Sequence, residues 1–139
     1  MSVFVFLDTN IIVYANDRRD PIKHRRAMEL VAEHMRDGTA VISTQVLQEY
    51  ANVALTRLKQ EEGVVLRILR LCETMKVIAT SPALVRRAVE LRRVYDVGFW
   101  DAGIIAAAEE ADCDRIITED FNPGQYYGGI LALNPFEEP

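Results

Sequence analysis

The sequence has few of the features that mark secreted, membrane-spanning or thiolate-metal proteins. Its two cysteines, Cys72 and Cys113, lie far apart, and neither belongs to a CxxC motif or has a histidine beside it. No apolar run approaches the roughly 18 residues of a membrane-spanning helix. The apolar start at residues 3–7 has no basic segment before it and meets Asp8 at once, unlike a signal peptide. We therefore expect free thiols in a reducing, cytoplasmic setting.

Three further absences exclude function classes. Residues 8–10, after the first apolar segment, contain no glycine, which excludes the glycine-rich turn of a dinucleotide-binding fold. Asn10 stands where a haloacid-dehalogenase-like phosphatase needs a second aspartate as general acid. Lys76 is the last lysine, so the chain lacks the late lysine with which a receiver domain contacts a phosphoryl group.

Basic residues are scarce at one end of the chain. Residues 1–95 carry a net charge of +4, whereas residues 96–139 contain one arginine and carry −9. Thirteen of the 16 basic residues are arginine, whose guanidinium matches phosphate geometry. Arginines on solvated helix faces explain the same composition equally well, so both interpretations stay open.

Short apolar segments alternate with amphipathic ones along the chain. We expect strands at residues 3–7, 40–42, 77–79, 115–118 and 130–133. Helices are expected at residues 11–15, 21–37, 44–58, 61–75 and 100–111, with Asp20-Pro21 starting the second and Gly38 ending it. A further helix is expected to start at Ser81-Pro82, with Leu84, Val85, Ala88 and Leu91 facing inward. Either Ser43 or Thr44 would cap the third helix. This alternation predicts one α/β domain over residues 1–139, with a parallel sheet covered on both faces.

Four acidic residues fall where such a sheet gathers its functional groups. Asp8 directly follows the first strand, and Asp120 follows the strand at 115–118. Glu49 lies about one turn into the third helix, and Asp101 opens the alanine-rich helix. Because the carboxyl ends of parallel strands and the starts of the next helices share one crevice, we expect these four side chains to converge.

Four carboxylates in one crevice repel each other unless a cation neutralises them. Oxygen ligands suit Mg²⁺ or Mn²⁺, and such a site hydrolyses phosphodiesters. Each acid also has an ordinary structural explanation: Asp8 as a helix cap, Asp101 as a complement to the helix dipole, and Asp120 as a turn residue. The convergence of all four favours the site.

The ordered motifs resemble the PIN domain, a family of Mg²⁺- or Mn²⁺-dependent ribonucleases. The motifs are Leu7-Asp8-Thr9-Asn10, Ser43 to Glu49, Trp100-Asp101-Ala102 and Thr118-Glu119-Asp120-Phe121. Residues 118–125, followed by Asn134-Pro135-Phe136, are similar to a bacterial branch of VapC-like toxins from type II toxin–antitoxin pairs.

The resemblance implies a three-layer α/β/α sandwich with a mostly parallel sheet of four to five strands. It implies that Asp8 and Asp101 are the main metal ligands, that Glu49 holds a metal-bound water or a second ion, and that Asp120 completes the pocket. Thr118 and Asn10 would support the acids, and Glu119 is an alternative fourth acid. RNA substrate, a small antitoxin protein and a homodimer are the implied partners.

Arg18 and Arg19, in the loop after the first helix, are candidate contacts for RNA phosphates. Trp100 and Phe99 adjoin Asp101, and we expect them to pack in the core rather than to stack on a base. Two alternatives to the toxin hypothesis stay open. One is a solitary RNA-processing PIN nuclease, and the other is a catalytically silent PIN-fold module that binds RNA or protein.

Overall fold

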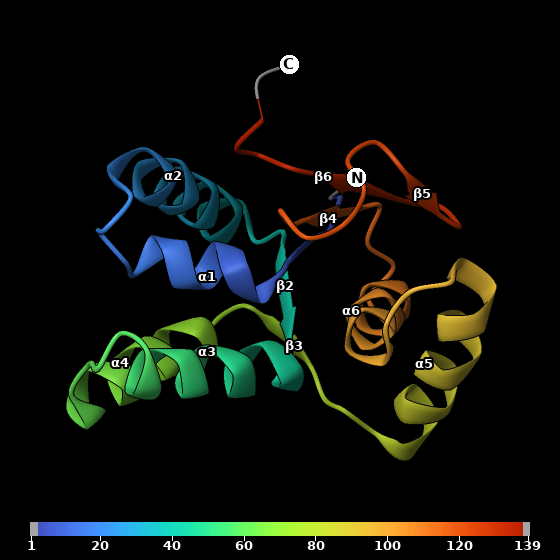
Figure 1. Cartoon of the computed structure of the whole chain (residues 1–139), viewed down its shortest axis with the longest axis horizontal. Helices are drawn as coiled ribbons and strands as arrows, with labels where there is room; N and C mark the ends of the chain where they lie inside the picture. The colour runs from blue at the N-terminus through green and yellow to red at the C-terminus, as the bar shows by residue number, and fades with distance from the viewer. Residues whose placement is uncertain (1–2, 138–139) are drawn as a thin grey trace.

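The computed structural model describes residues 3–137 and has three layers (Figure 1). Helices α1 to α4 cover one face of the central sheet, and α5 and α6 cover the other (Figure 1). The helices are α1 (Thr9–Ala15), α2 (Pro21–Asp37), α3 (Thr44–Thr56), α4 (Glu62–Cys72), α5 (Pro82–Tyr95) and α6 (Phe99–Glu110). The strands are β1 (Val5–Leu7), β2 (Ala40–Ser43), β3 (Lys76–Ile78), β4 (Arg115–Ile117), β5 (Tyr126–Tyr127) and β6 (Ile130–Leu133). The predicted α/β/α sandwich is confirmed.

The sheet has the strand order β3-β2-β1-β4-β6-β5, and every neighbouring pair is parallel except β5 with β6. Four to five strands were expected, and the additional one is β5. This strand has only two residues, too few for a hydrophobic pattern to reveal it. The two-residue turn Gly128-Gly129, with a positive φ of 66° at Gly128, folds it back onto β6.

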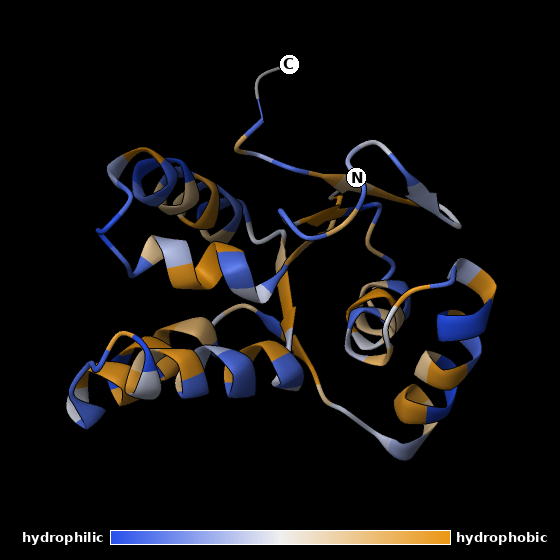
Figure 2. Ribbon diagram, in the orientation of Figure 1, coloured by the Kyte–Doolittle hydropathy of each residue, from blue (hydrophilic) through white to orange (hydrophobic). Residues whose placement is uncertain are grey.

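The central strands are hydrophobic along their length because both of their faces are covered (Figure 2). All residues of β1 and β2 are buried, and α6 is buried from Ala102 to Ala108. The small side chains of α6 let it lie close against its neighbours. A Cβ atom at Gly103 would lie 2.6 Å from Oε1 of Gln45 on α3, so glycine is needed to keep that side chain in place.

The starts expected for α2 and α3 agree with the structure, whereas α1 begins at Thr9, two residues before the expected start at residue 11. Asp20 caps α2, Pro21 is its first residue, and Gly38 ends it in the left-handed conformation. Ser43, rather than Thr44, caps α3 by accepting a hydrogen bond from the Val46 amide at 3.3 Å. No helix within residues 3–137 is both long enough and apolar enough to cross a bilayer.

Candidate active site

The strand order reverses its direction of growth at β1, whose neighbours are β2 and β4. In an open parallel sheet this is where the connections diverge to opposite faces and leave a crevice at the carboxyl ends. Asp8 directly follows β1, and Thr118 directly follows β4. Their side chains meet, because the Thr118 hydroxyl donates a hydrogen bond to Oδ2 of Asp8 at 2.8 Å.

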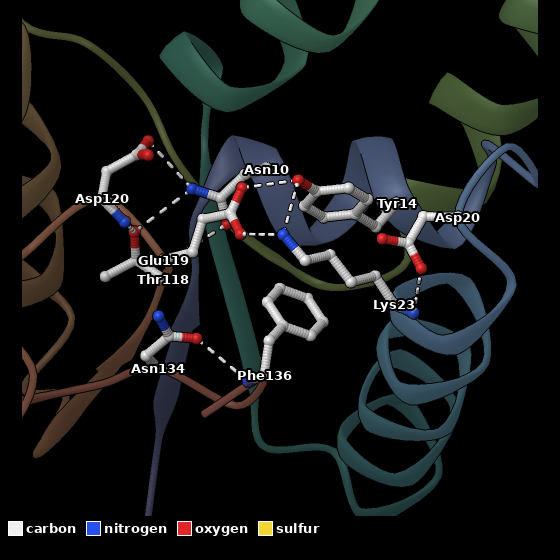
Figure 3. Close-up of polar contacts among 9 residues, drawn as sticks. All are labelled: Asn10, Tyr14, Asp20, Lys23, Thr118, Glu119, Asp120, Asn134 and Phe136. Carbon is white, nitrogen blue, oxygen red and sulfur yellow. Dashed lines mark hydrogen bonds and ion pairs between the residues drawn. The ribbon is translucent and has the colours of Figure 1, made fainter. Parts of the chain in front are cut away.

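Thr118 is saturated with hydrogen bonds. Its Oγ1 accepts from the Asp120 amide at 3.0 Å and from Nδ2 of Asn10 at 3.3 Å, which leaves its single proton for Asp8. Asn10 also donates from Nδ2 to Oδ2 of Asp120 at 3.0 Å (Figure 3). One hydroxyl and one amide therefore fix Asp8 and Asp120 relative to each other.

Glu49 reaches the same crevice from α3. Its Oε1 accepts from the Thr9 hydroxyl at 2.9 Å and from Nε2 of Gln45 at 3.3 Å. The same Gln45 nitrogen donates to the Trp100 carbonyl at 3.0 Å, and Trp100 directly precedes Asp101. This contact joins the start of α6, and with it Asp101, to Glu49.

Two of the four acids, Asp120 and Glu49, raise the pKa values of the other two, Asp8 and Asp101. Burial raises the pKa of Asp8 from 3.8 to about 7 against the opposing hydrogen bonds of Thr118 and Thr9, and the charges of Asp120 and Glu49 raise it further. Burial raises the pKa of Asp101 as well, and Asp120 and Glu49 again add to the shift. The ion pairs among residues 3–137 include none of the four. No ion pair within this part of the chain therefore relieves their mutual repulsion.

Glu119, the alternative fourth acid, faces away from the other carboxylates. It accepts a hydrogen bond from Tyr14 at 2.6 Å and forms an ion pair with Lys23 at 2.9 Å (Figure 3). Asp120 contacts Asn10 and raises the pKa of Asp8 and Asp101. The geometry therefore groups Asp120, and not Glu119, with Asp8, Glu49 and Asp101.

A cavity of about 680 Å³ opens beside Glu49 and Asp120, and its lining also includes Glu119 and Arg19. Arg18, by contrast, lines a different cavity with His24 and Arg25. The structure thus separates the two arginines that the sequence grouped. Arg19 is held by an ion pair with Asp17 at 2.9 Å.

Trp100 contradicts the expectation that it packs in the core. Its side chain is 67% exposed, whereas Phe99 is half-buried and contacts it edge-to-face at 5.1 Å. The reason is its position as the second residue of α6, two residues before the buried part of the helix begins at Ala102.

The donor set fits a hard divalent cation. All four groups are carboxylates, and the buried Asp8 has its two oxygens fixed by separate hydrogen bonds. Within residues 3–137, no three His, Cys, Asp or Glu side chains lie close enough together to hold a metal ion between them. Mg²⁺ usually binds through one or two carboxylates and keeps several waters, so it does not require a group of three protein ligands.

A family model decides what kind of domain carries this site. The model for the PIN domain matches residues 5–128. The chain belongs to the PIN domain family. No curated protein shows significant sequence similarity to it.

Solved structures match this PIN domain over most of its length. VapC20 from Mycobacterium tuberculosis, a toxin that cleaves the sarcin–ricin loop, has a TM-score of 0.67 and 22% identity, covering 81% of this chain and 86% of its own. A toxin–antitoxin complex from Klebsiella pneumoniae matches with a TM-score of 0.70 and 23% identity over 96% and 99%. VapBC2 from Rickettsia felis, bound to a DNA fragment from its promoter, has a TM-score of 0.62 and 20% identity over 85% and 89%.

Sequence reasoning missed three residues around the site of this PIN domain. Gln45 and Arg57 lie four residues before and eight residues after Glu49, which is the spacing of one helix face. Arg57 lines the same cavity as Glu49. That periodicity was a usable signal. Lys23 contacts Glu119 across 96 residues of sequence, and no local pattern predicts such a pair.

Proposed function

We propose that this PIN domain is a Mg²⁺- or Mn²⁺-dependent endoribonuclease and the toxin of a type II toxin–antitoxin pair, acting in the cytoplasm. The observation that carries the proposal is the group of four carboxylates at the strand switch, none of which forms an ion pair with a basic side chain of residues 3–137. The fold of VapC20, whose activity is cleavage of the sarcin–ricin loop, supports RNA as the substrate class.

In this proposal Asp8 and Asp101 are the main metal ligands, and Glu49 and Asp120 complete the pocket around them. A bound divalent ion supplies charge stabilisation at the phosphoryl group and lowers the pKa of a coordinated water. Neighbouring side chains hold these acids in position through hydrogen bonds. Thr118 fixes the Asp8 carboxylate and Asn10 fixes Asp120.

Thr9 and Gln45 orient Glu49 through hydrogen bonds to one oxygen, Oε1. In the proposed site Glu49 would hold a metal-bound water or a second ion. Arg19, one of two exposed arginines that line the cavity, provides positive charge next to its acidic residues. We assign it to the RNA backbone, because phosphate neutralisation dominates the affinity of nucleic-acid binding.

The proposed partner is a small antitoxin protein with an arginine that enters the acidic pocket. A guanidinium makes bidentate, charge-assisted bonds with carboxylates and would compete with the metal. The helix pair α3–α4 exposes Leu55, Leu66 and Leu71, and we assign this surface to the antitoxin's helix. The toxin–antitoxin complexes from Klebsiella pneumoniae and Rickettsia felis support a partner of this kind. A homodimer remains part of the proposal.

The test is cleavage of a structured RNA by the purified full chain in Mg²⁺, in Mn²⁺ and in EDTA. We expect cleavage with either metal and none in EDTA. Asp101→Asn should be inactive, and Asp112→Asn, which removes an exposed charge beyond the opposite end of α6, should be as active as wild type. RNA that is bound but left intact in both metals would instead identify a binding module.

The antitoxin hypothesis has its own test, which is co-purification of the neighbouring gene product followed by cleavage assays across Mg²⁺ concentrations. Inhibition should be competitive with Mg²⁺, and replacing the partner's pocket arginine by alanine should restore cleavage. A complex that stays fully active at limiting Mg²⁺ would refute occlusion. If no neighbouring product binds, a solitary RNA-processing nuclease explains the site better.

A further inference from the structure

Glu119 and Asp120 are sequence neighbours with opposite surroundings. Asp120 belongs to the acidic pocket, whereas Glu119 points between Asn10 and Tyr14 toward Lys23 (Figure 3). The Tyr14 hydroxyl donates to Oε1 of Glu119 at 2.6 Å, and the Lys23 ammonium contacts Oε2 at 2.9 Å. Each oxygen of the Glu119 carboxylate therefore has its own donor.

Both side chains of this ion pair are partly buried, whereas every other ion pair among residues 3–137 has at least one side chain that is more than 40% exposed. The Lys23 and Glu119 side chains are 33% and 23% exposed, whereas those of Arg87 and Glu109 are both 43% exposed. The Lys23 nitrogen lies 5.0 Å from the ring centre of Tyr14 and 5.4 Å from that of Phe136, and the two rings meet edge-to-face at 5.1 Å. Phe136 thus closes the pair from the C-terminal side, where solvent would otherwise screen it.

Lys23 stays charged in this environment. Its hydrogen bond to Glu119, followed by that to Tyr14, raises the pKa of Lys23 to about 12. Burial and the hydrogen bond to Glu119 raise the pKa of Tyr14 above its ordinary value, so the phenol keeps its proton and remains a donor. The positive charge of Lys23 is therefore matched to the negative charge of Glu119.

Asn10 forms hydrogen bonds with both Glu119 and Asp120 and so links these two residues to the acidic pocket. Oδ1 of Asn10 accepts from the Glu119 amide at 3.4 Å, and Nδ2 donates to Oδ2 of Asp120 at 3.0 Å. One amide side chain therefore spans the turn that sends Glu119 to one side and Asp120 to the other. A Glu119 released from Lys23 would place a fifth negative charge next to Asp120 and loosen this turn.

We propose that Lys23 is a positioning residue for the acidic pocket, which neutralises Glu119, holds it away from the four carboxylates and thereby keeps Asp120 in place for a divalent cation. The inference rests on the proposed function, because it concerns the same metal site. Lys23 touches neither substrate nor metal in this assignment. It acts through Glu119 and the backbone that leads to Asp120.

The test measures Mn²⁺ binding to the full chain by calorimetry and by electron paramagnetic resonance, without RNA. Partners one layer outside metal ligands commonly change affinity by about 10- to 100-fold, and we expect Lys23→Met to weaken Mn²⁺ binding by about 10-fold. Lys23→Arg keeps the charge and should retain most of the affinity. Glu119→Gln, which keeps an acceptor for Tyr14 without the charge, should bind Mn²⁺ about as well as wild type.

The double variant Lys23→Met/Glu119→Gln decides the mechanism. It lacks the charge that Lys23 has to neutralise, so it should recover most of the lost Mn²⁺ affinity. Arg87→Met is the matched control, because it breaks the ion pair with Glu109 between α5 and α6. Its Mn²⁺ affinity should equal that of wild type. If Lys23→Met fails to fold, Lys23→Gln, which keeps a hydrogen-bond donor, takes its place in both variants.

Two results would overturn the inference while leaving the proposed function intact. One is wild-type Mn²⁺ affinity in Lys23→Met together with a lower thermal midpoint, which would make the ion pair purely structural. The other is a double variant that binds Mn²⁺ as weakly as Lys23→Met. If wild type itself binds no Mn²⁺, the proposed function fails, and the inference fails with it. Mn²⁺ binding by wild type therefore distinguishes a failure of the proposed function from a failure of the inference alone.

Discussion

The buried carboxyl of Asp8 gives the metal-free protein a characteristic pH dependence. Asp8 is only 5% exposed, and burial raises the pKa of its carboxyl from 3.8 to about 7. Between these values the folded protein holds a proton that the unfolded chain releases. Stability therefore falls as the pH rises through this window, by about 1.4 kcal/mol per pH unit and about 4 kcal/mol in all as an upper limit.

Urea unfolding in EDTA measures this effect. From about pH 5 to about pH 8, wild type should lose about 3 kcal/mol more unfolding free energy than Asp8→Asn, which cannot ionise. Asp112→Asn removes an exposed charge and should follow wild type. Added Mg²⁺ favours the ionised carboxylate, so it should stabilise wild type more at the higher pH. Parallel pH profiles for wild type and Asp8→Asn would refute the argument that Asp8 is the protonated buried acid.

Two other substitutions test the site. Asp101→Asn should abolish cleavage while its thermal midpoint stays unchanged or rises, because repulsion from Asp120 and Glu49 is relieved; a large fall in the midpoint with activity retained would make Asp101 structural. Arg19→Ala should weaken RNA binding and lower the slope of log affinity against log salt by about one unit. Arg18→Ala should change the slope less, because Arg18 lines another cavity. Equal slopes in the two arginine variants would contradict this assignment.

Much of the fold was predictable because its signals are local. The apolar segments of β1 and β2 and the cap residues Asp20 and Ser43 act within a few residues of sequence. The two residues of β5 carry no such pattern, and only their pairing with β6 makes them a strand. Trp100 was wrongly expected in the core, because composition alone does not reveal which side of a helix start faces solvent.

The acidic positions were predictable for a topological reason. Two of the acids, Asp8 and Asp120, follow strands. The other two, Asp101 and Glu49, lie within the first two turns of helices, and a parallel sheet brings these positions to one edge. The choice between Asp120 and Glu119 was not predictable, since the two are adjacent. It depends on Lys23 and Tyr14, which reach Glu119 from α2 and α1. The catalytic roles of all four acids remain a proposal.

The central claim is that the four carboxylates hold a divalent ion that hydrolyses RNA. Its most direct test is single-turnover RNA cleavage measured across Mn²⁺ concentrations, with Mn²⁺ binding measured on the same metal-free preparation of wild type and of Asp101→Asn. We predict that the wild-type rate rises in proportion to bound Mn²⁺, and that Asp101→Asn loses both the rate and most of the binding. Full cleavage by wild type in EDTA, with the metal shown to be removed, would contradict the claim.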